Sequence, residues 1–160
     1  MRMLIAAVGK LKDDEERSMV SRYTKRIDTA GKSLAIGPLE ILELPESRAA
    51  SADERKADEA VRLLKIASDA DFTIALDVQG RSVSSEAFAN VLRKTRDNGA
   101  KSCAILIGGP DGHGSDVLAK ANLKLSLGAL TLPHGLARVV ISEQIYRAVT
   151  IIAGHPYHRA

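Results

Sequence analysis

The sequence contains a single cysteine and no long uninterrupted apolar stretch. Cys103 alone cannot form a disulfide within the chain, and its place in the apolar run Ser102–Ile107 predicts a buried structural thiol rather than a nucleophile. The first apolar run, Met3–Val8, is too short before Lys10 for a signal sequence, and no stretch approaches membrane-spanning length. These absences predict a cytoplasmic protein without a membrane partner.

Three common ligand motifs are also missing. The glycine-rich stretch Gly108–Gly114 lacks the Lys-Ser/Thr pair of a Walker loop, and its spacing does not fit a dinucleotide fingerprint. His155 and His158 have the spacing of a metal pair, but no carboxylate or cysteine lies near them in the sequence and Arg159 would repel a cation. We therefore expect no metal site. The net charge of +3, from 23 Lys and Arg against 20 Asp and Glu, permits a polyanionic partner without requiring one.

Alternating apolar and amphipathic segments predict an α/β fold with a mostly parallel sheet flanked by helices. The length of 160 residues, with 45% hydrophobic residues, predicts one domain over 1–160. Ser51, with Glu54 three residues later, predicts a helix N-cap. Residues 29–38 and 46–52 are expected to be mobile loops. We expect strands near 3–8, 38–44, 72–77, 103–107 and 123–127, and helices near 13–29, 51–68, 84–97 and 135–152.

The last predicted helix is apolar around most of its circumference. Its strongly polar positions are Arg138, Ser142, Glu143, Gln144, Arg147 and Thr150. Such a helix must be covered on more than one side, and a second copy of the chain is a natural cover, so we infer a homodimer. Glu143 and Arg147, four residues apart, predict an intrahelical ion pair.

Three segments could converge on one ligand crevice. Asp77–Gly80 and the Gly108–Gly114 stretch each follow a predicted strand, where parallel sheets place their ligands, and residues 127–132 follow another. Together they would form an apolar, backbone-lined pocket for a neutral or zwitterionic cofactor. The alternative for the glycine-rich stretch is an ordinary strand-to-helix turn, and Asp77 would then only cap a turn.

The end of the sequence combines residues suited to nucleic acid. Tyr157, His158 and Arg159 could stack on a base, bond a base edge and hold a phosphate. A loosely ordered polar tail is the alternative. His134 and Arg138 could share a helix face, or they could be a helix-entry histidine and a solvated arginine.

These residues occur in a set of motifs that together resemble one family. The motifs are Ala-Ala-Val-Gly-Lys at 6–10, Leu76-Asp77 with Gly80, Ile-Gly-Gly-Pro-Asp-Gly at 107–112, Leu-Thr-Leu-Pro-His at 130–134 with Arg138, Glu-Gln-Ile-Tyr-Arg-Ala at 143–148 and Pro-Tyr-His-Arg at 156–159. End to end, the chain resembles the RlmH-type large-subunit ribosomal RNA pseudouridine N3-methyltransferases of the SPOUT, or α/β-knot, superfamily. Two mild departures are Leu130, where methionine is common, and Gly135, where glutamine or proline is usual.

The resemblance implies a C-terminal trefoil knot that holds S-adenosylmethionine, and an obligate homodimer. It also implies methyl transfer to N3 of a pseudouridine in the intersubunit-bridge stem-loop of the large-subunit (23S) rRNA, with the assembled ribosome as partner. The expected cofactor-binding points, carried over by position, are Leu76, Gly108, Leu127, Gly128, Ala129, Leu130, Thr131 and Leu132.

Four residues are the expected catalytic group. His158 is the candidate base or base-orienting group, because imidazole titrates near neutrality. Arg159 and Arg138 would hold phosphate or polarise a uracil carbonyl, and Tyr157 would stack on the base. Two other functions stay open: a catalytically silent rRNA-binding or ribosome-assembly factor, and a nucleotide-dependent oxidoreductase, which the missing dinucleotide fingerprint disfavours.

Overall fold

The computed structural model describes residues 1–158, without the side chain of His158. Five strands form one parallel sheet in the order β2-β1-β4-β3-β5. This arrangement confirms the expected α/β class. The strands are β1 (Arg2–Val8), β2 (Leu39–Leu44), β3 (Phe72–Ser82), β4 (Ser102–Ile107) and β5 (Leu123–Ser126).

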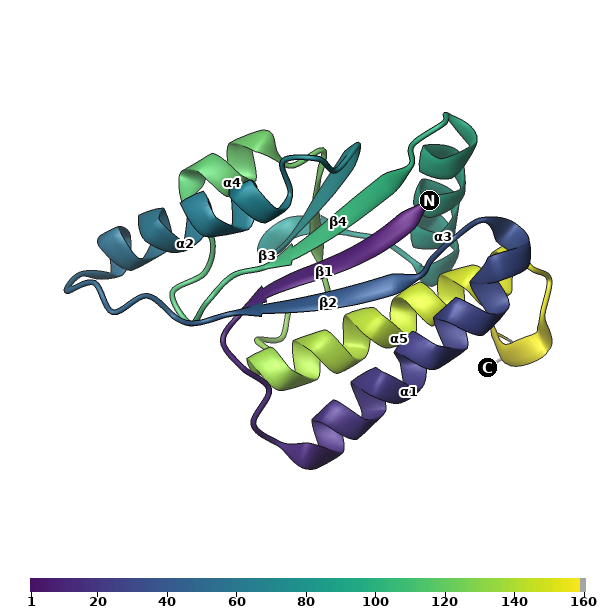
Figure 1. The fold of residues 1–160 in the computed structure, drawn as a ribbon, viewed down its shortest axis with the longest axis horizontal. Helices are drawn as coiled ribbons and strands as arrows, with labels where there is room; N and C mark the ends of the chain where they lie inside the picture. Colours follow the sequence, from purple (N-terminus) through teal and green to yellow (C-terminus); the bar gives the residue numbers. More distant parts are fainter. Residues whose placement is uncertain (159–160) are drawn as a thin grey trace.

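Helices cover both faces of the sheet (Figure 1). One face packs against α1 (Asp14–Gly31), α3 (Ser85–Asp97) and α5 (His134–Ile152), and the other against α2 (Ala52–Ile66) and α4 (Ser115–Lys120). Because successive strand residues point to opposite faces, Ile5 of β1 joins the first core and Ala6 the second. The short 3-10 helices are η1 (Lys32–Leu34) and η2 (Pro156–His158).

Local sequence signals predict the helix starts well. Ser51 accepts a hydrogen bond from the backbone N–H of Glu54 at 3.2 Å, and the Glu54 carboxylate accepts one from the Ser51 N–H at 3.1 Å. This capping box confirms the expected N-cap of α2. These hydrogen bonds hold the pKa of the Glu54 carboxyl below its usual value.

The structure corrects three expectations at element boundaries. Strand β3 continues to Ser82, past the expected end at Asp77, and pairs again with β5 after a shift in register. Gly80 permits this, since a Cβ there would lie 2.7 Å from the carbonyl carbon of Leu125. The expected loop at 29–38 contains the last residues of α1 and all of η1. The six-residue helix α4 was not expected, because it is too short to show a periodic pattern.

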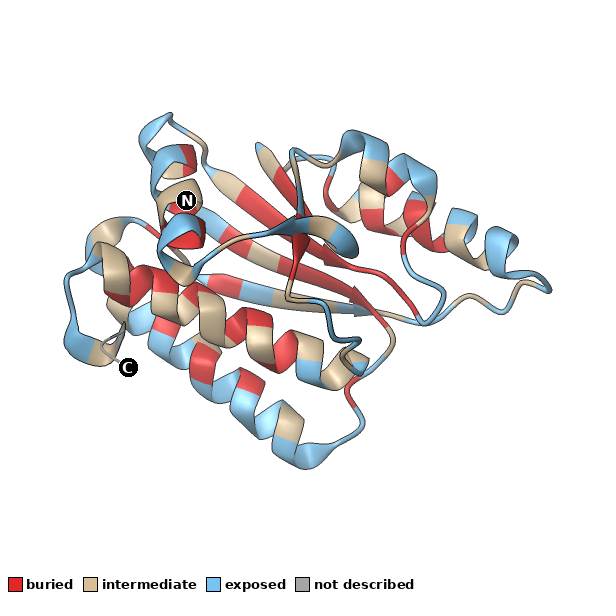
Figure 2. Ribbon diagram, turned by 180° about the vertical axis from the view of Figure 1, so that it is seen from behind, coloured by how far each residue is buried: buried red, intermediate tan, exposed pale blue. Residues whose placement is uncertain are grey.

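The apolar circumference of α5 is covered largely within the chain. The helix packs against α1 and α3 on one face of the sheet, and buried positions recur along it (Figure 2). Its Ile141, Ile145 and Val149 are fully buried. The composition of α5 is therefore explained without a second copy. The homodimer stays a prediction that rests on the family resemblance. No helix within residues 1–158 is long and apolar enough to span a membrane.

Candidate functional site

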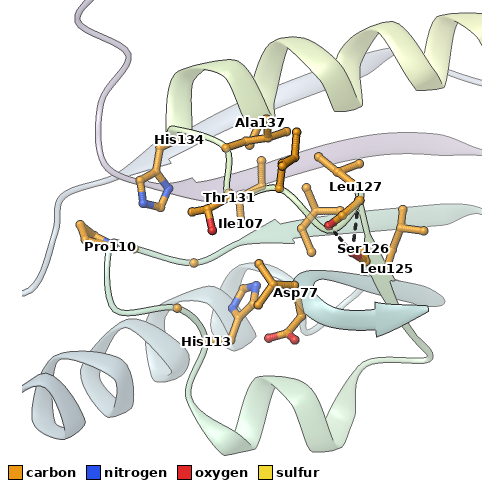
Figure 3. Close-up of a pocket in the computed structure, with 18 of the residues that line it drawn as sticks. Asp77, Ile107, Pro110, His113, Leu125, Ser126, Leu127, Thr131, His134 and Ala137 are labelled. Atoms are coloured by element: carbon orange, nitrogen blue, oxygen red, sulfur yellow. Dashed lines mark hydrogen bonds between the residues drawn. The ribbon is translucent and has the colours of Figure 1, made fainter. Parts of the chain in front are cut away.

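A cleft of about 370 Å³ lies beyond the carboxyl ends of β4 and β5 and beside the register shift in the middle of β3 (Figure 3). This is the edge at which parallel sheets bind ligands, and the volume falls in the range of small-molecule sites. The three segments expected from the sequence do meet here. Of the predicted cofactor-binding residues, Leu76, Gly108, Leu127, Gly128, Leu130, Thr131 and Leu132 line the cleft, whereas Ala129 is not part of its lining.

The walls of the cleft are mainly apolar, with a few polar groups between them. Leu76, Ile107 and Leu127 supply apolar surface. The Asp77 carboxylate accepts a hydrogen bond from the Gln79 N–H at 2.8 Å, at the register shift of β3, and it lines the cleft. The Ser126 hydroxyl donates to the carbonyl oxygen of Gly128 at 3.0 Å and accepts from its N–H at 3.2 Å. These two bonds fix the start of the segment that follows β5.

His113 lines the cleft and was not among the residues singled out from the sequence. Its side chain is only 9% exposed, and Nε2 lies 3.2 Å from the carbonyl oxygen of Leu106. Because a carbonyl can only accept, we assign the proton to Nε2, which leaves Nδ1 as a buried acceptor without a hydrogen-bond partner within the described structure. Burial lowers the pKa of His113. The sequence feature that could have identified His113 as a cleft residue is its position within the glycine-rich stretch Gly108–Gly114.

His134 and Arg138 begin helix α5 and have different surroundings. His134 lines the cleft, as a helix-entry residue can. Arg138 is only 2% exposed, so the solvated-arginine alternative is wrong. Its guanidinium donates to Glu43 Oε1 at 2.6 Å and to the carbonyl oxygens of Val8 at 3.0 Å and Gly9 at 2.6 Å. These bonds tie α5 to the ends of β1 and β2, and burial lowers the Arg138 pKa against the opposing effect of Glu43.

The described part of the tail packs on the far end of α5. Tyr157 donates a hydrogen bond to Glu143 Oε1 at 3.2 Å, and its ring meets the Tyr146 ring edge to face at 4.7 Å. Partial burial, with Tyr23 and Glu143 nearby, raises the pKa of Tyr157 to about 12. The expected Glu143–Arg147 ion pair is confirmed at 2.8 Å. The side chain of His158 and all of Arg159 lie outside the described residues.

The cleft adjoins His134 and Ala137 in the first turn of α5. The 3-10 helix η2 lies beyond the other end of α5 (Figure 1). Helix α5 has 19 residues, so about 27 Å separates its first and last residues along the axis. His134 lies at the cleft end and Tyr157 beyond the other end. The predicted catalytic tail and the predicted cofactor pocket of a single chain are therefore not brought together.

No group of three or more His, Cys, Asp or Glu side chains within the described part of the chain is arranged to hold a metal ion. A second cleft of about 280 Å³ adjoins the first and shares His134 with it. Lys10 and Lys12, both exposed, line this second cleft together with Glu16 and Glu46.

Comparison with known proteins gives consistent results. Residues 1–158 match the family model described as a predicted SPOUT methyltransferase. A protein of Xanthobacter autotrophicus is 49% identical over 160 residues, and one of Brucella anthropi is 45% identical over 160 residues; each match covers 100% of both chains. Both relatives are named ribosomal RNA large subunit methyltransferase H.

Solved structures support the fold. A probable methylase family protein from Haemophilus influenzae superposes with a TM-score of 0.57 at 14% identity, covering 97% of this chain and 69% of that one. TrmJ from Z. mobilis gives a TM-score of 0.55 at 16% identity, covering 92% of this chain and 70% of that one. Because the family model matches nearly the whole chain and full-length relatives reach 49% identity, the chain belongs to the SPOUT methyltransferase family.

Proposed function

We propose that the protein transfers a methyl group from S-adenosylmethionine to N3 of a pseudouridine in the intersubunit-bridge stem-loop of 23S rRNA, on assembled ribosomes. The observation that carries the proposal is full-length identity of 49% to a protein named as a large-subunit rRNA methyltransferase. The cleft at the strand ends supports it, because it joins the segments that the family resemblance assigns to the cofactor. The proposal includes the trefoil knot, the homodimer and, because ribosomes are its substrate, the cytoplasm.

The residues of the cleft fit this cofactor. Apolar side chains such as Leu76 and Leu127 suit an adenine ring. Asp77 supplies a carboxylate near which a sulfonium or an ammonium is favourable. The His113 imidazole contributes a buried part of the wall, and its Nδ1 is shielded from the cleft. Leu76, Gly108 and residues 127–132 would hold S-adenosylmethionine, which carries an already activated methyl group.

The chain's own groups then have to align N3 of the base and remove its proton. In this proposal His158 orients or deprotonates the base, Arg159 holds a phosphate or a carbonyl oxygen, and Tyr157 stacks. Arg138 has an indirect role, because its guanidinium already donates hydrogen bonds to Glu43 and to two backbone carbonyls. It fixes the ends of β1 and β2 relative to α5. Because the tail lies beyond the far end of α5, the tail of a second subunit would serve each cleft.

The second cleft carries charges of both signs, since Asp13, Glu16 and Glu46 line it together with Lys10 and Lys12. Exposed Lys10 and Lys12 lie beside the proposed cofactor cleft, where they can meet RNA phosphates. The small basic excess of +3 is modest for a protein that binds RNA alone. We therefore expect the ribosome to supply much of the recognition, and activity on a short naked stem-loop equal to that on ribosomes would contradict this.

The decisive experiment is transfer of labelled methyl from S-adenosylmethionine to ribosomes from a strain that lacks the modification. Assembled ribosomes and separated subunits are compared, and the methylated nucleotide is mapped. Methyl at N3 of one pseudouridine, preferentially in assembled ribosomes, is the expected result. Ribosome binding without methyl transfer or cofactor binding would instead favour a silent assembly factor.

A single substitution tests the proposed base. His158→Ala should lower the methylation rate without weakening S-adenosylmethionine binding, because His158 is assigned to the acceptor base and not to the cofactor. A wild-type rate with unchanged RNA affinity would remove this role from His158.

A further inference from the structure

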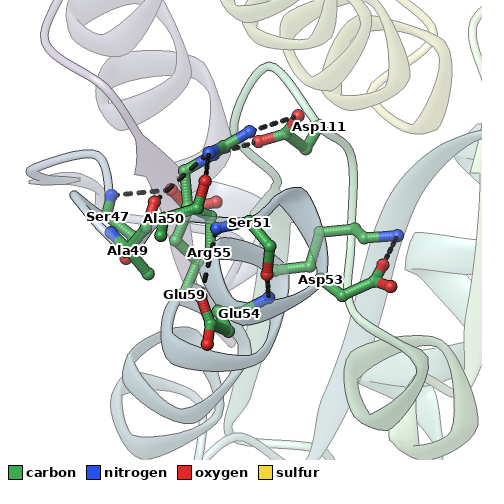
Figure 4. A network of polar contacts seen from close by, with 10 residues as sticks. Ser47, Ala49, Ala50, Ser51, Asp53, Glu54, Arg55, Glu59 and Asp111 are labelled. Carbon is green, nitrogen blue, oxygen red and sulfur yellow. Dashed lines mark hydrogen bonds and ion pairs between the residues drawn. The ribbon is translucent and has the colours of Figure 1, made fainter.

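One guanidinium of helix α2 joins two loops at the ligand edge of the sheet (Figure 4). Arg55 Nε donates to Asp111 Oδ2 at 2.7 Å and Nη2 donates to Asp111 Oδ1 at 3.2 Å, which makes the pair bidentate. Arg55 Nη1 donates to the carbonyl oxygens of Ala49 at 3.2 Å and Ala50 at 3.3 Å. The loop after β2 and the loop after β4 are therefore held by the same side chain.

Glu59 holds the same two loops one turn further along α2. It lies on the same helix face as Arg55, four residues on. Its side chain is only 3% exposed, and Oε1 accepts a hydrogen bond from the Ser47 N–H at 2.8 Å. Oε2 has no hydrogen-bond partner within the described structure and packs on Gly109, where a Cβ would lie 2.6 Å away. The carboxylate thus contacts both the 45–51 loop and the glycine-rich loop.

The glycine-rich loop is one wall of the proposed cofactor cleft. Gly109, Pro110 and Asp111 all line the cleft, whereas Arg55 and Glu59 do not. Asp111 therefore has two neighbours, the cleft on one side and Arg55 on the other. The ion pair lowers the pKa of the Asp111 carboxyl and raises that of Arg55, so both groups stay charged at neutral pH.

The ion pair by itself contributes little to global stability. The Arg55 and Asp111 side chains are 31% and 26% exposed, and exposed or half-exposed pairs are screened by solvent. Its main physical effect is geometric, since a bidentate pair fixes both the position and the plane of the carboxylate. A loop already held in its binding geometry loses less conformational entropy when a ligand binds.

We propose that Arg55 is a positioning residue for the cofactor cleft: it holds the Gly109–Asp111 wall in its cofactor-binding geometry, with Glu59 supporting the same wall. The inference rests on the proposed function, in which this cleft binds S-adenosylmethionine. Arg55 acts through Asp111 and does not touch the cofactor. Its loss weakens cofactor binding and leaves the chemistry at saturating cofactor close to wild type.

The test is calorimetric titration of the full-length protein with S-adenosylmethionine. Arg55→Gln should raise the Kd about tenfold, because the wall must then be ordered on binding. Arg55→Lys keeps the positive charge but lacks the planar guanidinium that donates two parallel hydrogen bonds. Its Kd should therefore lie between those of the wild type and Arg55→Gln. The matched control is Arg62→Gln. Arg62 also lies on α2 and pairs with Asp58 and the Pro45 carbonyl, without contact to the glycine-rich wall, so its Kd should match wild type.

Two further readouts separate positioning from general destabilisation. In the methylation assay, Arg55→Gln should raise the KM for S-adenosylmethionine while kcat stays near wild type. Its thermal midpoint should fall by no more than about 3 °C, as expected for a half-exposed ion pair. The double variant Arg55→Gln/Asp111→Asn should bind no more weakly than the weaker single variant, because both changes remove one interaction.

Each contrary result has a separate meaning. Wild-type affinity in Arg55→Gln overturns the inference, and so do additive effects of the Arg55 and Asp111 changes. If Arg55→Gln does not fold, the Kd values of Arg55→Lys and Asp111→Asn for S-adenosylmethionine decide instead. Wild-type affinity in both of these variants overturns the inference. Failure of the wild-type protein to bind S-adenosylmethionine would refute the proposed function of the cleft itself.

Discussion

At the scale of single residues, His113 combines deep burial with a position on the cleft. Burial lowers its pKa in the folded protein below the unfolded value of about 6.5. Well above pH 6.5 the imidazole is neutral in both states and adds no pH dependence. As the pH falls below 6.5, the unfolded chain binds a proton that the folded chain excludes, so stability falls until the folded pKa is reached.

This linkage can be measured with His113→Gln, whose side-chain amide can still donate to the Leu106 carbonyl. Urea unfolding at pH 7, 6 and 5 should show that the wild type loses more free energy of unfolding than the variant. Parallel curves for the two proteins would contradict the depressed pKa.

Cys103 gives a second prediction at this scale. The side chain is fully buried in β4, and burial raises the pKa of the thiol to about 12. A thiol-specific chromogenic reagent at pH 8 should therefore leave the folded protein unreacted and label one thiol after unfolding in denaturant. Cys103→Ala, which has no thiol, is the negative control. Rapid labelling of the native protein would show that the thiol is accessible, against the buried structural role expected from the sequence.

At the scale of elements, the capping box of α2 makes a separable contribution to stability. Ser51→Ala removes the hydroxyl that accepts from the Glu54 N–H, and it should lower the free energy of unfolding by about 1 kcal/mol. Ser18→Ala, at an exposed site inside α1, is the control and should change stability little. Equal urea midpoints for the two variants would show that the cap is dispensable.

The start of α5 packs closely against a carboxylate of α1. Gly135 lies against the Glu16 carboxylate of α1, and a Cβ at this position would lie 1.8 Å from Glu16 Oε2. The N-cap residue of α5, Pro133, offers no side-chain hydrogen bond, and a carboxylate near a helix N-terminus is electrostatically favourable. A side chain at position 135 would therefore require the Glu16 carboxylate to move away from the helix start.

At the scale of the whole molecule, the separation of cleft and tail predicts complementation between subunits. We expect a Gly108→Val cleft variant and a variant lacking residues 156–160 each to be inactive alone. Mixed and re-equilibrated dimers should regain about a quarter of wild-type activity, because half of the dimers are mixed and each has one intact cleft facing one intact tail. Purified mixed dimers without activity would show that the tail does not act across subunits.

Much of the fold follows from the sequence because the signals are short-ranged. Apolar runs such as Cys103–Ile107 are recognised as strands from their own composition, although β4 pairs with the distant β1 and β3. Ser51 with Glu54 starts a helix through contacts within a few residues. The convergence of three strand-following segments on one cleft was also predictable, since the carboxyl ends of parallel strands meet at one edge.

Only the tertiary structure decided which distant residues meet. Arg138 is buried against Glu43, which lies 95 residues earlier in the chain, although its helical neighbours equally allow a solvated arginine. The bond from Arg55 to Asp111, the Glu16 carboxylate beside Gly135 and the length of α5 between cleft and tail are likewise consequences of packing. Local sequence determines which segments become helices or strands, whereas side-chain partners far apart in the chain are determined by how the finished elements pack.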